Sequence, residues 1–255
     1  MTVISYNLNG IRAAIKKGFI NWLATNPADV ICIQETKAEK ENIDFEAITN
    51  LGYQQCWFSA QKKGYSGVAI FSKLPFTKVV LGTGFTQSDF EGRVISANIN
   101  GCTIINAYYP SGTSGNVRQA YKMQWLNEFY TYLEKLKKKK AKLIITGDYN
   151  IAHNPIDIHD PKGNKNSSGF LPDERAWLDT LYNNGYTDTL RHITQQPHLY
   201  SWWSMRFPTV RLNNKGWRID YISVTNNLKT AIKDAGILPN IIHSDHCPVW
   251  VELGI

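Results

Sequence analysis

The sequence contains little cysteine, and the cysteines it has are widely spaced. Among 255 residues there are four, Cys32, Cys56, Cys102 and Cys247, and no two of them form a CxxC pair. This spacing argues against a structural zinc site and gives no sign of a disulfide framework. Cys32 and Cys102 lie in apolar stretches typical of strands. We therefore interpret the cysteines as small, reduced residues of the core.

Long apolar runs are also absent. No stretch approaches the roughly 18 consecutive apolar residues that suggest a membrane span. The sequence begins Met1-Thr2-Val3-Ile4, without a cationic and then apolar leader. We therefore expect a cytoplasmic protein with no membrane partner.

Tandem repeats, low-complexity tails and linkers are missing too. A chain of this length suits one large domain, and we expect residues 1–255 to form it. The hydrophobic content of 43% is that of a globular protein with a sizeable core. The net charge of +7 favours an anionic partner, with nucleic acid first and a membrane surface second.

Short stretches of β-type sequence recur along the chain. They cover residues 3–8, 29–34, 67–72, 94–99, 103–109, 142–146, 219–224 and 247–253. Several are apolar at consecutive positions, as in Val30-Ile31-Cys32-Ile33, which is typical of strands buried on both faces. Asn100-Gly101 between two of them favours a hairpin.

Apolar residues at three- and four-residue spacing predict helices over residues 11–25 and 117–136. The second ends in four lysines, residues 137–140, which form either a DNA-binding patch or, more commonly, a basic last turn that complements the helix dipole. Together the elements predict an α/β fold with two packed mixed sheets and helices outside. Residues 152–170 form the longest loop, and loops beyond about 12–15 residues are usually functional or disordered.

Polar residues that suit a metal ion stand at the ends of several predicted strands. They are four carboxylates, two amides and one histidine: Glu35, Asp148, Asp220, Asp245, Asn7, Asn150 and His246. Strand ends on one edge of a sheet converge on a common cleft. Oxygen ligands without thiols suit magnesium or manganese, and a hard divalent ion among carboxylates is the usual apparatus of phosphate-ester chemistry.

Each of these residues also has an ordinary interpretation. A single Asp after a strand is more often a helix cap or a turn former, and a single His beside an Asp is more often part of a structural hydrogen bond. Five such strand ends in one chain are harder to explain in this way. The residues themselves therefore predict a metal-dependent phosphodiesterase.

The chain resembles the exonuclease III family of apurinic/apyrimidinic (AP) endonucleases, within the endonuclease/exonuclease/phosphatase superfamily. The matching motifs occur in the family's order and cover nearly the whole chain. They are NLNGIRA at residues 7–13, QETK at 34–37, GYSGV at 64–68, EGRV at 91–94, NAYYP at 106–110, GDYNIAH at 147–153, PKGNK at 161–165, GF at 169–170, ER at 174–175, GWRIDY at 216–221 and SDHCP at 244–248. The resemblance implies a four-layered α/β sandwich.

The resemblance also implies roles for individual residues. Glu35 is the expected principal ligand of the metal, and Asn7, Asp148, Asn150, Asp245 and His246 complete the expected metal set, with Asn9 nearby. Asp148 would orient or deprotonate the attacking water, and Asn150 would support that water and the phosphate. His246, paired with Asp220, would stabilise the developing negative charge, and Tyr108 would hydrogen-bond the phosphate.

DNA contacts are implied at a second set of positions. They are Arg12, Lys17, Lys37, Tyr65, Asn164, Trp202 and Trp217, and the two tryptophans would form the walls of a pocket for a base-free sugar. For Trp203 we keep the ordinary interpretation of a core tryptophan. Extrusion from the duplex costs least where no base is paired or stacked, so such a pocket selects abasic nucleotides.

The chain departs from the family pattern at four positions. Asn9 stands where some relatives have Asp, Ser111 where an amide is common, Ser167 where abasic-specialised members have Asn, and Trp202 where Phe is usual. These departures leave open the balance between AP endonuclease, 3′-phosphodiesterase or phosphatase and 3′→5′ exonuclease activity.

The function implied is that of a DNA-repair enzyme of the exodeoxyribonuclease III type. We expect it to cleave 5′ to abasic sites with Mg²⁺, or with Mn²⁺, and to leave a 3′-hydroxyl. Its expected partner is double-stranded DNA with abasic or 3′-blocked lesions, and the expected state is a monomer. The alternatives are a phosphoinositide or phospholipid phosphodiesterase and a non-catalytic nucleic-acid-binding regulator of the same fold.

Overall fold

The computed structural model describes residues 1–139, 142–207 and 209–255. Its strands form two six-stranded sheets. The first has the order β11-β12-β1-β2-β4-β3, with β1 Thr2–Asn7, β2 Val30–Gln34, β3 Gln54–Phe58, β4 Val68–Ser72, β11 Ile232–Ile237 and β12 Val249–Leu253. The second has the order β5-β6-β7-β8-β10-β9, with β5 Lys78–Leu81, β6 Val94–Ile99, β7 Cys102–Tyr108, β8 Leu143–Asp148, β9 Tyr186–Asp188 and β10 Asp220–Thr225.

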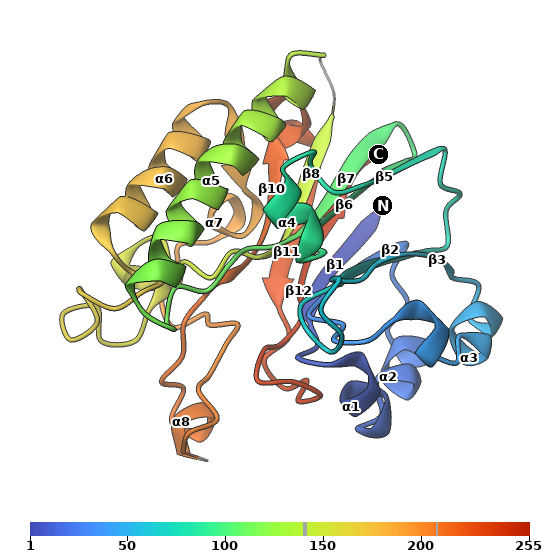
Figure 1. Ribbon diagram of the computed structural model, residues 1–255, viewed down its shortest axis with the longest axis horizontal. Coiled ribbons are helices and arrows are strands. Elements are labelled where there is room, and N and C mark those ends of the chain that lie inside the picture. The colour runs from blue at the N-terminus through green and yellow to red at the C-terminus, as the bar shows by residue number, and fades with distance from the viewer. Residues whose placement is uncertain (140–141, 208) are drawn as a thin grey trace.

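Helices cover the outer faces of both sheets (Figure 1). The α-helices are α1 Ile11–Lys16, α2 Phe19–Thr25, α3 Glu46–Asn50, α4 Thr86–Phe90, α5 Asn116–Lys137, α6 Pro172–Asn183, α7 Thr189–Ile193 and α8 Thr209–Leu212. Short 3-10 helices are η1 Lys40–Asn42, η2 Pro155–Asp157 and η3 Asn226–Ala231. Helices α1 to α3 pack on the first sheet, and α5 and α6 pack on the second. No helix among the described residues is both long and apolar enough to cross a membrane.

The continuous apolar strands are explained by burial on two faces. In β2, Val30 and Cys32 point into the layer between the two sheets, whereas Ile31 and Ile33 point toward the helices of the first sheet. The predicted α/β fold with two packed mixed sheets and flanking helices is confirmed. All four cysteines are free; Cys32, Cys102 and Cys247 are buried, as predicted for core residues, whereas Cys56 is half-buried.

Two local predictions have different outcomes. Strands β6 and β7 pair in an antiparallel hairpin, and Asn100 and Gly101 both have positive φ, as a tight hairpin turn requires. The single helix predicted over residues 11–25 is wrong, because Gly18 with φ 93° separates α1 from α2. Glycine adopts this backbone conformation without the steric cost that other residues have.

The helix predicted over residues 117–136 is confirmed as α5. Its last turn contains Lys135 and Lys137, in agreement with a basic turn at the negative end of the helix dipole. The last lysine of the run, at position 140, lies outside the described residues.

Candidate active site

The register of both sheets brings the predicted strand ends together. In the first sheet, parallel pairing aligns Asn7 with Gln34, the residue before Glu35. In the second, parallel pairing aligns Tyr108 with Asp148. The antiparallel strand β10 begins at Asp220, directly opposite Asp148. Because the two sheets pack face to face, these ends meet at one edge of the sandwich.

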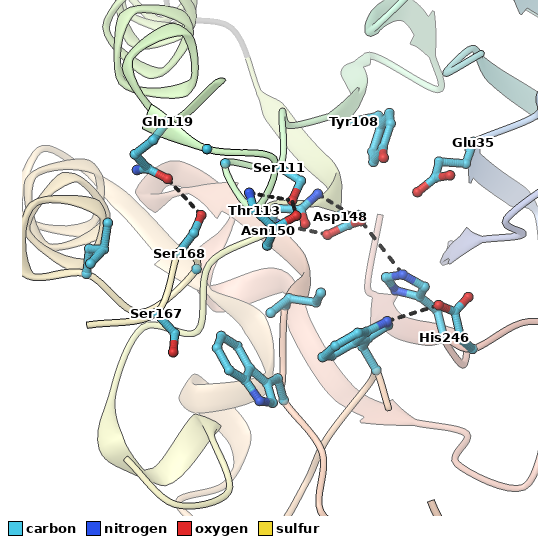
Figure 2. Close-up of a pocket in the computed structure, with 18 of the residues that line it drawn as sticks. Glu35, Tyr108, Ser111, Thr113, Gln119, Asp148, Asn150, Ser167, Ser168 and His246 are labelled. Carbon is cyan, nitrogen blue, oxygen red and sulfur yellow. Dashed lines mark hydrogen bonds and ion pairs between the residues drawn. The ribbon is translucent and has the colours of Figure 1, made fainter. Parts of the chain in front are cut away.

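A pocket of about 650 Å³ opens at this edge (Figure 2). Eight of the predicted site residues line it: Glu35, Tyr108, Asp148, Asn150, Trp202, Trp217, Asp245 and His246. Two more, Asn7 and Asp220, are buried directly behind the lining and hydrogen-bond to it. The structure therefore gathers every predicted catalytic and metal-ligating residue in one place.

His246 is held between two carboxylates. Its Nδ1 lies 2.9 Å from Oδ2 of Asp220, and its Nε2 lies 3.9 Å from Oδ2 of Asp148. Burial by itself lowers the pKa of His246, but the charges of Asp220 and Asp148 outweigh burial and raise the pKa above its usual value. The imidazole is therefore protonated at neutral pH and can stabilise negative charge in the pocket.

Asp148 receives several hydrogen bonds. The amide nitrogens of Asn7 and Asn150 donate to its Oδ2, over 2.9 and 3.2 Å, and the backbone N–H of Asn150 donates to its Oδ1 over 2.8 Å. Burial raises the pKa of Asp148. The charge of His246 lowers it, but burial outweighs this and the net shift is upward. A raised pKa makes the carboxylate a better acceptor for a proton from water.

The pKa of Glu35 shifts in the opposite direction to that of Asp148. Burial raises the pKa of Glu35, but the charge and hydrogen bond of Lys37, together with hydrogen bonds from other neighbours, outweigh burial, so the net shift is downward. Nζ of Lys37 lies 2.6 Å from Oε2 of Glu35 and donates over 2.5 Å to Oδ1 of Asn9. The amide nitrogen of Asn7 donates to Oε1 of Glu35 over 3.1 Å. Glu35 is thus an ionised carboxylate that shares the amide of Asn7 with Asp148 and could offer oxygen ligands.

Asp245 connects the acidic end of the pocket to the tryptophan wall. Its Oδ1 accepts a hydrogen bond from Asn9 over 2.9 Å, and its Oδ2 accepts one from the indole of Trp202 over 3.0 Å. Burial raises the pKa of Asp245, but the charge of His246 and the hydrogen bonds from Asn9 and Trp202 together outweigh burial, so the pKa is lowered overall. Its carboxylate therefore stays anionic.

The acidic cluster could bind a metal ion. Among the described residues, ligand atoms of Asp148, Asp220 and His246 lie within 4.8 Å of one another. One buried oxygen of this group, Oδ1 of Asp220, has no hydrogen-bond partner in the described part of the chain. His246 is a poor metal ligand while its imidazole is protonated and paired with Asp220, because a ligating histidine must be neutral. The ionised carboxylates on the pocket wall, Glu35 first, fit a hard divalent cation better.

Two predicted ligands, Asn7 and Asn150, use their amide nitrogens to hold the carboxylates of the site. Asn7 offers its amide nitrogen to Glu35 and Asp148, and its amide oxygen accepts from the backbone N–H of Asn9 over 2.9 Å. Asn150 likewise directs its amide nitrogen to Asp148 and to the carbonyl of Tyr109. Their roles as metal ligands stay predictions.

The backbone is unusual around the acidic residues. Asn9, Glu35, Lys37 and Asn150 all have φ between 48 and 51°. Non-glycine residues adopt this left-handed conformation at a cost, and it concentrates at functional sites. Gly147, just before Asp148, is also required, because a Cβ there would collide with the carbonyl of Ala107 on the neighbouring strand. Of the four side chains with this conformation, those of Glu35 and Asn150 line the pocket.

The far side of the pocket is aromatic and polar. Trp202 and Trp217 lie at 89° to one another with ring centroids 6.1 Å apart, and Gly169 allows the backbone to approach Trp217. Ser111 and Ser167, two of the four departures from the family pattern, also line the pocket. Nearby polar lining residues that the sequence did not single out are Thr113, Asn116, Gln119, Asn166 and Ser168.

The other predicted DNA contacts lie outside the pocket lining. Arg12 lines a separate groove, and Nζ of Lys17 donates to the carbonyl of His243 over 3.2 Å. The hydroxyl of Tyr65 accepts hydrogen bonds from Arg93 and Arg118, over 3.0 and 2.8 Å. The amide of Asn164 donates to carbonyls of its own loop. These positions, with Lys37, stay predictions for a larger ligand surface.

A buried ion pair beneath the pocket was missed from the sequence. Lys122 on α5 and Glu174 on α6 are fully buried, with Nζ 2.6 Å from Oε1. Lys122 also donates to the carbonyl of Asn150 over 2.8 Å, and Glu174 accepts from the backbone N–H of Gly169 over 2.6 Å. The available signal was a lysine among the apolar positions of a helix, which are occupied here by Trp125, Leu126 and Phe129.

Comparisons with known proteins agree with this geometry. The endonuclease/exonuclease/phosphatase family matches residues 4–246. An exodeoxyribonuclease of Bacillus subtilis (strain 168) is 40% identical over 259 residues, which cover 100% of both chains.

Two solved structures have the same fold. An AP endonuclease from Archaeoglobus fulgidus superposes with a TM-score of 0.93 at 31% identity, over 100% of both chains. A 3′ phosphatase from Neisseria, bound to a product DNA hairpin, superposes with a TM-score of 0.92 at 28% identity, over 99% of both chains.

Proposed function

The chain belongs to the endonuclease/exonuclease/phosphatase family, in its exonuclease III-type branch of DNA-repair nucleases, and on this premise we propose that its pocket hydrolyses the phosphodiester 5′ to an abasic site. The products are a 3′-hydroxyl and a 5′-phosphate on the abasic sugar. The observation that carries the proposal is that one pocket contains both the Asp148–His246–Asp220 group and the Trp202–Trp217 wall. The first suits phosphate chemistry, and the second suits a sugar without its base.

The proposed reaction uses this chain's residues as follows. Asp148 accepts a proton from a water molecule held by Asp148 and Asn150, and the water oxygen forms a bond to phosphorus. The bond from phosphorus to the 3′-oxygen breaks, and that oxygen takes a proton from solvent. The protonated His246, oriented by Asp220, donates a hydrogen bond to a phosphate oxygen as charge develops, and Tyr108 donates a second.

A divalent cation, Mg²⁺ with Mn²⁺ as a substitute, would neutralise the phosphate and stabilise the leaving oxygen. Glu35 is the proposed principal ligand, because it is ionised, lines the pocket and lies beside Asp148. Asn7, Asp148, Asn150 and Asp245 complete the proposed metal set. The predicted ligation by His246 is not part of it, because its imidazole is protonated and paired with Asp220.

We further propose that residues 1–255 act as one catalytic domain, as a monomer in the cytoplasm. The proposed substrate is duplex DNA with abasic or 3′-blocked lesions, and Arg12, Lys17, Lys37, Tyr65 and Asn164 would contact its strands. Trimming of 3′ ends, as an exonuclease, phosphodiesterase or phosphatase, uses the same pocket. The solved Neisseria 3′ phosphatase of the same fold supports this second activity.

The test is cleavage of a 5′-labelled synthetic duplex with a single abasic site, in Mg²⁺ and in EDTA. We expect cleavage only with the metal and an end that a polymerase can extend, which identifies a 3′-hydroxyl. Hydrolysis of inositol phosphates or sphingomyelin in place of DNA would favour the lipid phosphodiesterase alternative. DNA binding without any cleavage would favour a non-catalytic regulator.

A further inference from the structure

A loop beside the pocket projects away from the two sheets. Its described residues, 204–207 and 209–216, include α8, which projects beyond the sheets at the lower edge of Figure 1. Trp202 and Trp217 close its base, because each donates its backbone N–H to the other's carbonyl over 2.9 Å. Both tryptophans line the pocket, so the loop begins and ends at the pocket wall.

Arg211, on α8, attaches this loop to a second segment. Its guanidinium donates three hydrogen bonds to backbone carbonyls: to Ser244 over 3.0 Å, to Pro239 over 2.8 Å and to Ile241 over 2.7 Å. The guanidinium also lies 4.4 Å from the centroid of the Trp203 ring. A side chain at the base of the loop and one on α8 thus stack together.

The second segment, residues 238–244, is the irregular connection that leads from β11 to Asp245 and His246. Within the described residues, no backbone N–H donates to the carbonyls of Pro239, Ile241 or Ser244, so Arg211 is their donor. The residues that follow are fixed to the loop base as well. The N–H of Trp203 donates to the carbonyl of Asp245 over 3.1 Å, and the indole of Trp202 donates to the Asp245 side chain.

We infer that Arg211 is a positioning residue that fixes Asp245 and His246 relative to the tryptophan wall. The connection that precedes Asp245 has no regular structure, and the three hydrogen bonds from Arg211 add to the one from Lys17 to the carbonyl of His243 in holding it. The pocket needs its phosphate-binding end and its sugar-binding wall in one fixed geometry, and a misplacement of about 1 Å can cost about 10²-fold in rate. This inference rests on the proposed function.

The chemistry of the guanidinium is essential to this role. Its planar fork has five N–H donors and reaches three carbonyls at once, whereas an ammonium is a compact group on a flexible stem. Arg206, in the same loop, is an exposed arginine and a matched control. It has the same charge and lies in the same segment, but it does not hold residues 238–244.

The test compares the Arg211→Gln, Arg211→Lys and Arg206→Gln variants on two substrates in Mg²⁺. One is the abasic duplex, and the other is bis(p-nitrophenyl) phosphate, a diester too small to touch the loop. We expect both Arg211 variants to lower kcat about 10- to 100-fold on the duplex and to lose activity on the small diester in the same proportion. Binding of the duplex in EDTA should change by less than about threefold, because Arg211 is engaged with carbonyls rather than phosphates.

Arg206→Gln should keep kcat on the duplex and full activity on the small diester. An increase in KM on the duplex alone, with the small diester unaffected, would make Arg211 an ordinary DNA contact and overturn the inference. Wild-type kcat in Arg211→Lys would overturn it as well, and this variant decides the matter if Arg211→Gln does not fold. An inactive wild-type protein would instead overturn the proposed function, and this inference with it.

Discussion

At the scale of single residues, the site depends on two charges that burial keeps apart from solvent. His246 and Asp148 are both almost fully buried and both have raised pKa values, which leaves a protonated imidazole facing a basic carboxylate. Such a pair supplies a proton acceptor for water and a cationic donor for phosphate within one pocket. The roles are complementary, so removing either residue should affect turnover more than binding.

We expect His246→Asn and Asp148→Asn each to lower kcat on an abasic duplex by about 10²–10³-fold or more, as loss of one preorganised group does. Affinity for the duplex in EDTA should stay close to that of the wild type, because most affinity comes from phosphate contacts outside the pocket. A gel cleavage assay and a binding assay on one substrate measure both. His192→Asn, an exposed histidine away from the pocket, is the control, and near-normal cleavage by either pocket variant would contradict the roles.

The tryptophan wall gives a second prediction at this scale. Trp217→Ala should lower the ratio of kcat/KM on abasic DNA to kcat/KM on intact DNA by about tenfold, because it enlarges the pocket that excludes a base. Trp202→Ala does not test the wall alone, because it also removes the hydrogen bond to Asp245. Trp217→Phe should keep most of the ratio. An unchanged ratio in Trp217→Ala would show that the wall does not select the substrate.

At the scale of secondary-structure elements, helices α5 and α6 support the pocket through one buried ion pair. Glu174 accepts hydrogen bonds from Lys122, Gln119 and the backbone N–H groups of Gly169 and Leu171. The pair therefore joins two helices to the loop that carries Ser167, Ser168 and Gly169. A change in the pair should affect both stability and the shape of the pocket.

Lys122→Met should lower the free energy of unfolding by about 3–5 kcal/mol, because it leaves Glu174 charged, buried and without its counter-ion. Adding Glu174→Gln should recover part of this loss, since the second change removes the isolated charge. Lys135→Met, an exposed position on the same helix, should change stability by no more than about 0.5 kcal/mol. Urea denaturation measures all three, and equal stability of Lys122→Met and the wild type would contradict the argument.

Eight of the twelve strands in the described part of the chain could be predicted from the sequence. All eight stretches predicted as strands form strands in the structure, because strands buried on both faces have apolar residues at consecutive positions. Strands β3, β5, β9 and β11 were not predicted, since they are short or exposed, as β5 is at all four positions. The site acids were predictable because each adjoins a strong strand. Lys122 and Arg211 were not, because their roles depend on carbonyl groups far away in the sequence.

At the scale of the whole molecule, three apolar layers lie within one chain. The layer between the sheets and the two outer layers each bury apolar side chains, and both sheets contribute to the site. If residues 1–255 form one domain, as proposed, neither sheet can unfold without the other. Fluorescence and far-UV circular dichroism should then report one coincident unfolding transition, and two separated transitions would contradict a single domain.

Acid stability depends on a buried carboxylate that anchors the long loop to the second sheet. Asp157 accepts hydrogen bonds from Arg218 over 2.7 Å and from Arg191 over 2.6 Å. Burial by itself raises the pKa of Asp157, but the two guanidinium groups outweigh it and lower the pKa to about 2. A carboxylate in an unfolded chain has a pKa of about 3.9. The ionised form is therefore favoured by folding.

A carboxylate whose pKa is lower in the folded protein than in the unfolded chain stabilises the folded state at pH values above its unfolded-state pKa. This stabilisation is lost as the pH falls through its folded-state pKa. Asp157 should contribute about 2–3 kcal/mol above pH 5 and lose it between about pH 4 and pH 2. The difference in unfolding free energy between the wild type and Asp157→Asn, measured with urea, should therefore be largest near neutrality and shrink across this window. A difference that stays constant from pH 6 to pH 2.5 would show that Asp157 acts through packing rather than through its charge.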